Sequence, residues 1–402
     1  MKRTVCSACG SAELDQFLDL GPSPIADAYT ATPDEQSARY PLQVAVCAKC
    51  KLVQLLEVVP AEVLFGAGYS FYSSASAPLS AYHADYARDV LRRYGRLASR
   101  RGVVEVGCND GDLLRHFGAV RHLGVDPSTG PAAVAMERGC RVLVDPFGLA
   151  SAERIRTADG TFGIVIANHV LAHVEDVSDM LAGIARLMDD ESIAMVEVQY
   201  LPDLLVNNAF DLVYHEHRNF FSLTSLEAAA SRHGLFAIDA ELTDRQGGSI
   251  RVTFGRACQL ARRTDRVHAL LNSERWLDSF GAYEGMQGRA ERIRARLLDL
   301  IGQFDTVAMY GAPAKATTLL SFCGLDHTRI RWCEDSTPAK QGRYVAGTGI
   351  AIHRPNNPAG DPVVDLPRPD AYLLASWNYS SAIMAANPGN RWIVPFPAPT
   401  VY

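Results

Sequence analysis

Apolar and polar stretches alternate most regularly from Gly102 onward. Apolar runs at 103–107 (VVEVG), 122–126 (HLGVD), 162–174 (FGIVIANHVLAHV) and 192–199 (SIAMVEVQ) are separated by segments with helical spacing of apolar residues. Strands that alternate with helices are typical of βαβ units and a parallel sheet. A second set of such runs, at 306–322, 329–342, 371–378 and 391–397, predicts another open α/β domain. The predicted fold class is therefore α/β.

The rest of the chain has a different pattern. In residues 1–60, Pro22, Pro24 and Pro33 and many turn residues exclude long helices, so short strands and loops are expected. Residues 61–100 start with aromatic and small polar residues and continue as an amphipathic helix that leads into the first α/β domain. A charged amphipathic pattern over 262–300 predicts one long helix that connects the two α/β domains.

Four of the nine cysteines form two Cys-x-x-Cys pairs at the two ends of the N-terminal block. A block this small cannot build a large hydrophobic core, so it needs a metal ion or a cross-link to stabilise it. Four thiolates can close a tetrahedron around zinc and leave no open coordination position, so this ion would be structural. Redox dithiols or unbound thiols are the alternative, and the other five cysteines are expected to be reduced. The expected zinc ligands are Cys6, Cys9, Cys47 and Cys50.

Composition narrows the class of protein. The chain has 402 residues, enough for two or three domains, and its 48% hydrophobic and 21% charged content is typical of a soluble globular protein. A net charge of −6 argues against nucleic-acid partners and anionic membranes. The chain has neither an apolar run of membrane-spanning length nor a basic-then-apolar start, so a cytoplasmic protein is expected.

The turn after the first strand of the α/β core suggests a ligand. Gly107 and Gly111 let the backbone approach a ligand at the carboxyl end of the sheet, and the acidic residues of this turn would repel phosphate. Asp126 ends the next strand, where a carboxylate can take both hydroxyls of a ribose. A nucleoside with an amino-acid tail fits both features, so S-adenosylmethionine is the expected cofactor. The alternative is that Glu105 and Asp126 merely cap helices. The expected cofactor-binding residues are Glu105, Gly107, Asn109, Asp110, Gly111, Asp126, Pro127 and Asn168.

Residues 210–222, FDLVYHEHRNFFS, place four hydrogen-bonding side chains in a row. If the segment were a strand, His215 and His217 would share a face, and with His173 they would form the metal centre of a hydrolase or oxygenase. The aromatic pair that follows does not continue strand alternation, which favours an acid–base site. A plain surface loop is the third interpretation.

The second α/β domain has its own candidate turn. In YGAPAK, Gly311 and Lys315 lie between a strand and a helix, where backbone amides and a lysine could meet a diphosphate. Arg343 is a further candidate for the same ligand. The alternative is a structural domain in which this lysine is merely a solvated helix residue.

Taken in order, the motifs resemble those of the sugar C-methyltransferase family, which methylates carbon 3 of nucleotide-linked 4-keto deoxysugars in antibiotic biosynthesis. The resemblance covers nearly the whole chain. It implies a zinc-binding domain at 1–65, a methyltransferase domain at 66–280 and a nucleotide-sugar-binding Rossmann-like domain at 281–402. The motifs are the two Cys-x-x-Cys pairs, PSPIADAY, YSFYSSAS, VVEVGCNDG, GVDPS, ANHVLAHVED, FDLVYHEHRNFFS, QGGSIRV, YGAPAKATTLL, CEDSTPAKQGRYVAGTGIAI and SWNY.

The resemblance also implies roles in the active site. His217 is similar to the family's proposed general base, with Glu216 beside it, and the other polar groups near the sugar would be Tyr214, His173 and either Tyr69 or Tyr72. Two departures stand out. AGTGIAI replaces a run similar to Pro-Gly-Thr-His-Ile-Pro, and His169 stands where an apolar residue or asparagine is expected.

These residue types suit carbon methylation through an enolate. A histidine can remove the hydrogen next to a ketone, a neighbouring carboxylate such as Glu216 can fix the histidine's tautomer, and Tyr214, Tyr72 or a protonated His173 can stabilise the enolate oxygen. The alternatives are N- or O-methylation, the metal-dependent hydrolase, and a non-catalytic nucleotide-sugar-binding protein. We expect a nucleotide-sugar partner, no nucleic acid or membrane partner, and a monomer or weak oligomer.

Overall fold

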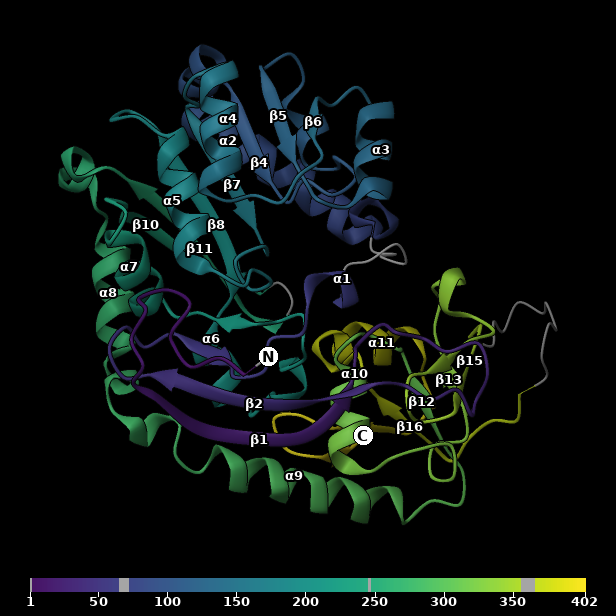
Figure 1. Ribbon diagram of the computed structural model, residues 1–402. Coiled ribbons are helices and arrows are strands. Elements are labelled where there is room, and N and C mark those ends of the chain that lie inside the picture. The colour runs from purple at the N-terminus through teal and green to yellow at the C-terminus, as the bar shows by residue number, and fades with distance from the viewer. Residues whose placement is uncertain (1, 65–71, 245–246, 356–365) are drawn as a thin grey trace.

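The computed structural model describes residues 2–64, 72–244, 247–355 and 366–402, and Figure 1 shows their arrangement. An α/β core forms the upper part of Figure 1. Below it lie the N-terminal sheet and the C-terminal α/β domain, side by side. Among the described residues, no helix is long and apolar enough to cross a membrane.

The upper sheet has seven strands in the order β10-β11-β8-β7-β4-β5-β6. The five strands from β8 to β6 are parallel, and β11 is antiparallel to both of its neighbours. Strand order reverses between β4 and β7, so their carboxyl ends flank the crevice where open α/β sheets bind ligands. The strands are β4 (Val103–Val106), β5 (His122–Val125), β6 (Val142–Leu143), β7 (Ile164–Asn168), β8 (Ile193–Gln199), β10 (Phe236–Thr243) and β11 (Ser249–Gly255), and the helices are α2 (Ala77–Arg101), α3 (Thr129–Glu137), α4 (Leu149–Asp159), α5 (Val177–Leu187), α6 (Leu201–Val206) and α7 (Leu223–Ser231).

The C-terminal sheet repeats this plan, which confirms the α/β class. Its order is β14-β15-β13-β12-β16-β17-β18, with five parallel strands in the middle and an antiparallel strand at each edge. The crevice lies between β12 and β16. The elements are β12 (Val307–Tyr310), β13 (Cys333–Glu334), β14 (Tyr344–Val345), β15 (Ile350–His353), β16 (Ala371–Leu374), β17 (Trp392–Val394), β18 (Thr400–Val401), α10 (Ala316–Cys323) and α11 (Ser380–Ala386).

The N-terminal sheet has the order β1-β2-β3-β9 and is antiparallel. Its strands β1 (Leu14–Pro24) and β2 (Arg39–Cys47) have 11 and 9 residues, longer than the sequence suggested, because two register shifts in their pairing accommodate the turn residues and prolines. β3 (Val53–Leu55) pairs with β9 (Asn219–Phe220), which follows the YHEH segment. The short helix α1 (Ala61–Leu64) ends this block.

The single helix expected over 262–300 is wrong. The chain forms α8 (Asp265–Ser273) and α9 (Met286–Ile301), joined by two short 3-10 turns. Gly285 has φ +79°, which ends helical continuity, and the break lets Leu277 and Tyr283 enter the core, where they are 0% and 1% exposed. In Figure 1, α9 lies along the lower edge of β1.

Two hydrophobic cores join the N-terminal block to the rest of the molecule. One contains Cys6, Cys47 and Cys50 together with apolar residues of α5, α7 and the upper sheet. The other contains the apolar face of β1 and β2 together with α9, α10 and the C-terminal sheet. The N-terminal sheet therefore fixes the two α/β domains relative to each other.

Candidate functional site

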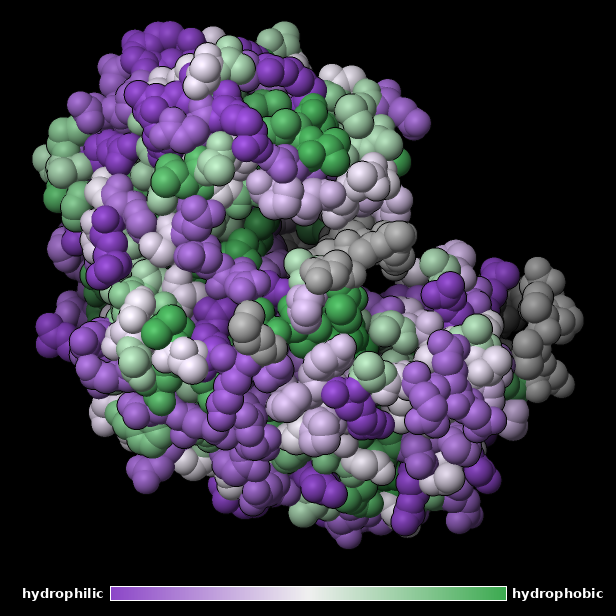
Figure 2. All heavy atoms as spheres, in the orientation of Figure 1, coloured by the Kyte–Doolittle hydropathy of each residue, from purple (hydrophilic) through white to green (hydrophobic). Residues whose placement is uncertain are grey.

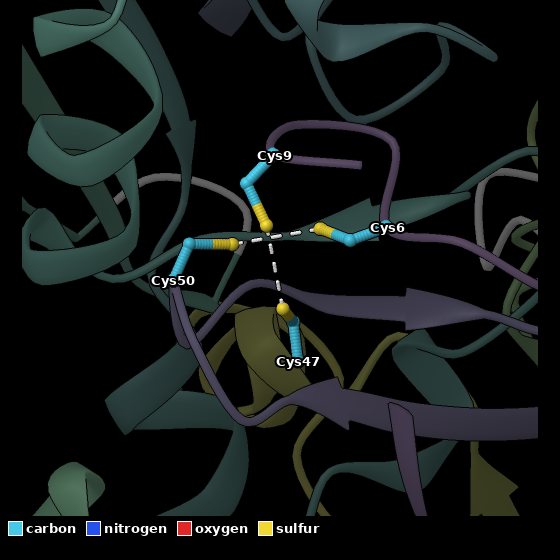
Figure 3. A group of neighbouring side chains, drawn as sticks. All are labelled: Cys6, Cys9, Cys47 and Cys50. Atoms are coloured by element: carbon cyan, nitrogen blue, oxygen red, sulfur yellow. Dashed lines mark hydrogen bonds between the residues drawn. The ribbon is translucent and has the colours of Figure 1, made fainter. Parts of the chain in front are cut away.

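The four paired cysteines meet at one point, as predicted. Their sulfur atoms all lie within 4.8 Å of one another, and Figure 3 shows all four pointing toward a common centre. The closest pairs are Cys6 with Cys50 at 3.5 Å and Cys9 with Cys47 at 3.6 Å. Four thiolates in this arrangement fit a tetrahedral zinc ion.

Each Cys-x-x-Cys pair is shaped by the same tight turn. The amide of Gly10 donates to the carbonyl of Cys6, and the amide of Lys51 donates to that of Cys47, at 2.9 and 3.0 Å. Gly10 and Lys51 have φ of +73° and +62°. A left-handed conformation is unfavourable for a lysine, so the surrounding structure must hold Lys51 in it.

The turn after β4 has the geometry of a ligand-binding turn. Gly107 has φ +72°, and a Cβ there would lie 2.4 Å from Cγ2 of Val170, so the turn packs directly on the chain that follows β7. At the end of β5, Asp126 accepts hydrogen bonds from the amides of Asn109 (2.9 Å) and Ser128 (2.8 Å). The remaining lone pairs of its carboxylate can accept ribose hydroxyls. Pro127 follows at the start of the loop to α3.

The acidic residues of this turn have protein partners of their own. Asp110 accepts from the amide and hydroxyl of Ser74 and lies 3.2 Å from Arg138. Asp112 is paired with His83 and Arg115. Asp110 holds the chain before α2 against the turn, as Asn109 does by accepting from Ser73 at 2.9 Å, and Asp112 holds α2 itself through His83. Their charges are thus neutralised inside the protein rather than directed at a phosphate.

Oδ1 of Asp110 in this turn lacks a partner among the described residues. So do two buried atoms on the flanking strands, Oε2 of Glu105 on β4 and Nδ2 of Asn168 at the end of β7. Burial, and next the negative charge of Asp126, raise the pKa of Glu105 well above its usual value. A ligand with both donors and acceptors, such as the amino-acid tail of S-adenosylmethionine, would satisfy the atoms of Glu105 and Asn168. Figure 2 shows this face hollowed between the upper core and the two lower domains.

The YHEH segment lies where all three parts of the molecule meet. Backbone atoms of 210–219 accept or donate hydrogen bonds to the N-terminal sheet, to the loop after β7 and to α10, so the segment is not a plain surface loop. The anchoring bonds are His215 Nε2 to the Tyr40 carbonyl (3.1 Å), Leu55 amide to the Arg218 carbonyl (2.9 Å), Arg218 amide to the Ala172 carbonyl (2.7 Å), and Thr318 Oγ1 to the Val213 carbonyl (2.8 Å).

Tyr214 and His217 form a hydrogen-bonded pair in this segment. Nδ1 of His217 lies 3.1 Å from the carbonyl of Leu212, which can only accept, so Nδ1 carries the proton. Nε2 is then an acceptor, and the Tyr214 hydroxyl donates to it at 2.6 Å. His217 is 5% exposed, and burial lowers its pKa well below its usual value. The imidazole is therefore neutral, as a general base must be.

Two expectations about its neighbours are wrong. The carbonyl of Leu212, and not the carboxylate of Glu216, fixes the tautomer of His217. Burial, followed by the charge of Asp27, raises the pKa of Glu216 to about 8, so this group is a neutral carboxyl at pH 7. Nδ1 of His173 donates to the Glu216 carbonyl at 2.8 Å, and burial lowers the pKa of His173 to about 4, so it is not a protonated donor either.

The metal-dependent alternative fails on geometry. His215 bonds to Tyr40 of β2, whereas His217 bonds to Leu212 and Tyr214, so the two rings face different partners. Among the residues that the structure describes, no group of His, Cys, Asp and Glu side chains other than the four cysteines comes close enough to share a metal ion.

Of the two candidate tyrosines before α2, the structure describes Tyr72, whereas Tyr69 lies outside the described residues. The hydroxyl of Tyr72 lies beside Gly130 at the start of α3, 3.1 Å from where a Cβ of that glycine would be. This places Tyr72 next to the ribose end of the crevice, near Asp126, and its role toward the sugar stays a prediction.

The second α/β domain repeats the local geometry of the first. Gly311 has φ +81°, and a Cβ there would lie 2.3 Å from the hydroxyl of Ser376, just after β16. Asp335 accepts from the amides of Ala312 (2.7 Å) and Thr337 (2.8 Å), as Asp126 does in the first domain. The turn thus has the form of a nucleotide-binding turn, and its contact with a ligand stays a prediction.

Lys315 is buried rather than solvated. Its ammonium donates to Asn378 at 2.8 Å, lies 4.0 Å from the centre of the Trp377 ring, and is 3.9 Å from Asp211. Burial, partly offset by the charge of Asp211, lowers the pKa of Lys315 to about 8. Lys315 therefore has an internal role, joining the second domain to the YHEH segment. Arg343 is exposed, and contact of either residue with a diphosphate stays a prediction.

The structure explains one change in AGTGIAI. Gly349 stands where the expected run has histidine, and a Cβ there would lie 2.9 Å from His327. Gly347 is shared with that run, and a Cβ there would lie 2.7 Å from Pro24. The carbonyl of Gly347 accepts from Arg39 at 3.1 Å. The loop is therefore a contact between the C-terminal domain and the N-terminal sheet, and larger residues would not fit there.

Sequence reasoning missed a buried network at the ends of β7 and β8. Glu197 is 0% exposed and contacts Tyr82, Arg251 and His169. The signal was present in the sequence, because Glu197 is a charged residue in the otherwise apolar run SIAMVEVQ. A charge in such a strand needs partners, and these come from α2, β11 and the end of β7.

Comparison with known proteins agrees with this geometry. A zinc binding domain model matches residues 6–65, a methyltransferase domain model matches 79–239, and a C-methyltransferase C-terminal domain model matches 244–397. The C-methyltransferase NovU of Streptomyces niveus is 34% identical over 412 aligned residues, which cover 98% of this chain and 96% of NovU.

Two solved structures align with part of this chain at low sequence identity. Magnesium protoporphyrin IX methyltransferase (ChlM) from Synechocystis PCC 6803 with bound SAH is 17% identical and covers 48% of this chain and 91% of its own, with a TM-score of 0.36. The PH0226 protein from Pyrococcus horikoshii OT3 is 16% identical and covers 46% and 94%, with a TM-score of 0.37.

Proposed function

The chain belongs to the sugar C-methyltransferase family and is an S-adenosylmethionine-dependent methyltransferase with a zinc site, and from this premise we propose that it methylates carbon 3 of a nucleotide-linked 4-keto deoxysugar. The setting we propose is the biosynthesis of an antibiotic or other natural product. Bound S-adenosylmethionine supplies an electrophilic methyl group, and Glu105, Gly107, Asp126 and Asn168 are the residues that would hold it.

The neutral Tyr214–His217 pair is the observation that carries the proposal. Nε2 of His217 accepts a 2.6 Å hydrogen bond from the Tyr214 hydroxyl, and Tyr214 is more exposed than the buried imidazole. As the hydrogen next to the ketone leaves carbon, the Tyr214 oxygen takes it and passes its own proton to Nε2 of His217. The Leu212 carbonyl then holds the imidazolium through Nδ1–H. This step needs an acidic carbon–hydrogen bond, which favours carbon methylation over N- or O-methylation.

The position of the pair also supports a large, two-part substrate. The segment that carries it contacts the methyltransferase core on one side and α10 of the C-terminal domain on the other. A sugar at Tyr214 could therefore extend its nucleotide toward the turn at Gly311 and Asp335. We propose this turn, with Arg343 at its margin, as the nucleotide-binding part of the site.

Incubation with ¹³C-methyl-labelled cofactor and a panel of 4-keto sugar nucleotides tests the proposal. We expect a product in which the labelled methyl carbon shows one-bond coupling to a sugar carbon in a ¹³C-enriched substrate. Coupling to nitrogen would show N-methylation, and a methyl attached through oxygen would show O-methylation; either result would contradict carbon methylation. A His217→Gln variant that still binds S-adenosylhomocysteine provides the matched control.

A further inference from the structure

His169 lies between the cofactor turn and the catalytic segment, and the mechanism above does not use it. It directly follows β7 and directly precedes Val170, whose side chain packs on Gly107 of the cofactor turn. Three and four residues later, Ala172 accepts from Arg218 and His173 donates to Glu216. His169 is therefore at the crevice, where sulfonium and sugar would meet.

The backbone of His169 is strained. Its φ of +54° is left-handed, a conformation that non-glycine residues rarely adopt. The conformation is held by Glu197 of β8, whose carbonyl accepts from the amide of His169 at 2.6 Å. Strain held in this way at the end of a central strand fixes the direction of the side chain.

The same glutamate also orients the imidazole. Nε2 of His169 lies 3.2 Å from Oε1 of Glu197. Burial alone would raise the pKa of Glu197, but hydrogen bonding and charge from His169, together with Arg251 and Tyr82, lower it to about 2. The carboxylate is thus ionised and can only accept, so Nε2 carries a proton. This is the carboxylate–imidazole pair that the sequence suggested for Glu216 and His217.

The second nitrogen of the ring is available. Nδ1 of His169 makes no hydrogen bond to any residue within 2–64, 72–244, 247–355 or 366–402, and the side chain is 23% exposed, whereas Glu197 is fully buried. The charged or titratable groups around His169 are Glu197 on β8, Arg251 on β11, Tyr82 on α2, and the imidazoles of His173 and His217.

We propose that the His169 imidazolium, held by Glu197, donates a hydrogen bond from Nδ1 to the carbonyl oxygen of the sugar as that oxygen becomes an enolate. The inference rests on the proposed function. The carbon–hydrogen bond breaks, the proton goes to the Tyr214–His217 pair, and the electron pair moves onto the carbonyl oxygen opposite Nδ1–H. That electron pair then forms the carbon–methyl bond as the sulfur–methyl bond breaks, leaving the ketone and S-adenosylhomocysteine.

Two variants at one position test the proposal, with kcat, KM and S-adenosylhomocysteine affinity as readouts. His169→Asn keeps an N–H donor and tolerates positive φ, His169→Gly relieves the strain but has no donor, and the wild type is the reference. We expect His169→Gly to lower kcat about 10²–10³-fold, the usual effect of losing one such donor, with little change in KM or cofactor affinity. His169→Asn should recover most of kcat.

The two variants separate this role from a structural one, because His169→Asn keeps the N–H donor and should recover kcat, whereas His169→Gly has no donor. Wild-type kcat in His169→Gly would overturn the proposal, and so would an inactive His169→Asn with normal cofactor affinity, since that would make His169 the base. If instead the wild type methylates none of the 4-keto sugars, it is the proposed function that fails.

Discussion

Burial shifts the pKa values of two proposed catalytic residues in opposite directions. His217 and Glu216 are adjacent in the chain, and the loss of water lowers the pKa of the imidazole and raises that of the carboxyl to about 8. Both groups are therefore uncharged at neutral pH. A neutral imidazole can accept a proton and a neutral carboxyl can donate a hydrogen bond, which is what proton removal next to a ketone requires.

The Tyr214–His217 pair should be essential to the chemistry and unimportant for cofactor binding. We expect His217→Gln to lower kcat by about 10²–10⁴-fold, the range for a general base, and Tyr214→Phe to lower it similarly. Calorimetric titration with S-adenosylhomocysteine should give wild-type affinity for both. His215→Gln is the matched control in the same segment, and a comparable loss of kcat there would argue against a specific role for His217.

Glu216 should make stability depend on pH in a defined direction. Its folded pKa of about 8 is above the ordinary value of 4.5, so the folded state binds the extra proton and stability is lost as pH rises between these values. Glu216→Gln removes this penalty. We expect its melting temperature to exceed that of the wild type by about 2–4 °C at pH 8, which corresponds to about 1 kcal/mol for a domain of this size, and to match it at pH 4.5. A larger gain at the lower pH would contradict the assignment.

At the scale of elements, we expect the turn between β4 and the next helical turn to position the cofactor. Gly107→Ala would place a Cβ 2.4 Å from Val170 at a left-handed φ, and the turn would have to move. We expect at least about a tenfold loss of cofactor affinity in a titration, or about 1.4 kcal/mol. Gly118→Ala is the control, because Gly118 also has a positive φ but open space around it. Equal losses in the two variants would show that backbone strain, rather than the contact, is responsible.

The strands of the upper sheet could be predicted from the sequence because strands buried on both faces appear as continuous apolar runs. β4, β5 and β8 begin and end within about two residues of the apolar runs that predicted them, and β7 begins within two residues of its run but ends at Asn168, well before that run does. β3 and β9 have three and two residues, so their pairing comes from tertiary contacts that no local pattern records. The connector was mispredicted because a charged amphipathic pattern continues across Gly281 and Gly285, where the chain turns to bury Leu277 and Tyr283.

The same division applies to the site. Cys-x-x-Cys spacing and the turn at Gly107 depend on neighbours in the chain, so the four-cysteine cluster and the cofactor crevice could be inferred. The partners of His217 and His169 depend on which strands lie side by side. Glu197 is 28 residues from His169 and could be paired with it only once β7 and β8 were known to be adjacent.

At the scale of the whole molecule, the zinc site and the catalytic segment are mechanically linked. Ser7, between two of the zinc ligands, donates to Asn219 of β9 at 2.9 Å, two residues after His217. Asn219 in turn donates to the carbonyl of Val174 in the loop after β7. The zinc-binding turns therefore support the catalytic loop although they take no part in the chemistry.

Zinc removal should consequently reduce activity without exposing a catalytic metal. We expect one zinc per chain by elemental analysis, and Cys9→Ala should lower both the zinc content and the melting temperature, with kcat falling as β9 loses its support. The Cys258→Ala variant is the control, since Cys258 is exposed and remote from the cluster. Two metal ions per chain, or full activity in zinc-free protein, would contradict this account.

The most direct test of the account is hydrogen exchange at the sugar carbon in the absence of methyl transfer. A 4-keto sugar nucleotide is incubated in D₂O with enzyme saturated with S-adenosylhomocysteine, and deuterium next to the ketone is followed by NMR. The account predicts enzyme-dependent exchange with the wild type and background exchange with His217→Gln. Methyl transfer to carbon by a wild-type enzyme that never catalyses this exchange, or exchange at the wild-type rate in His217→Gln, would contradict it.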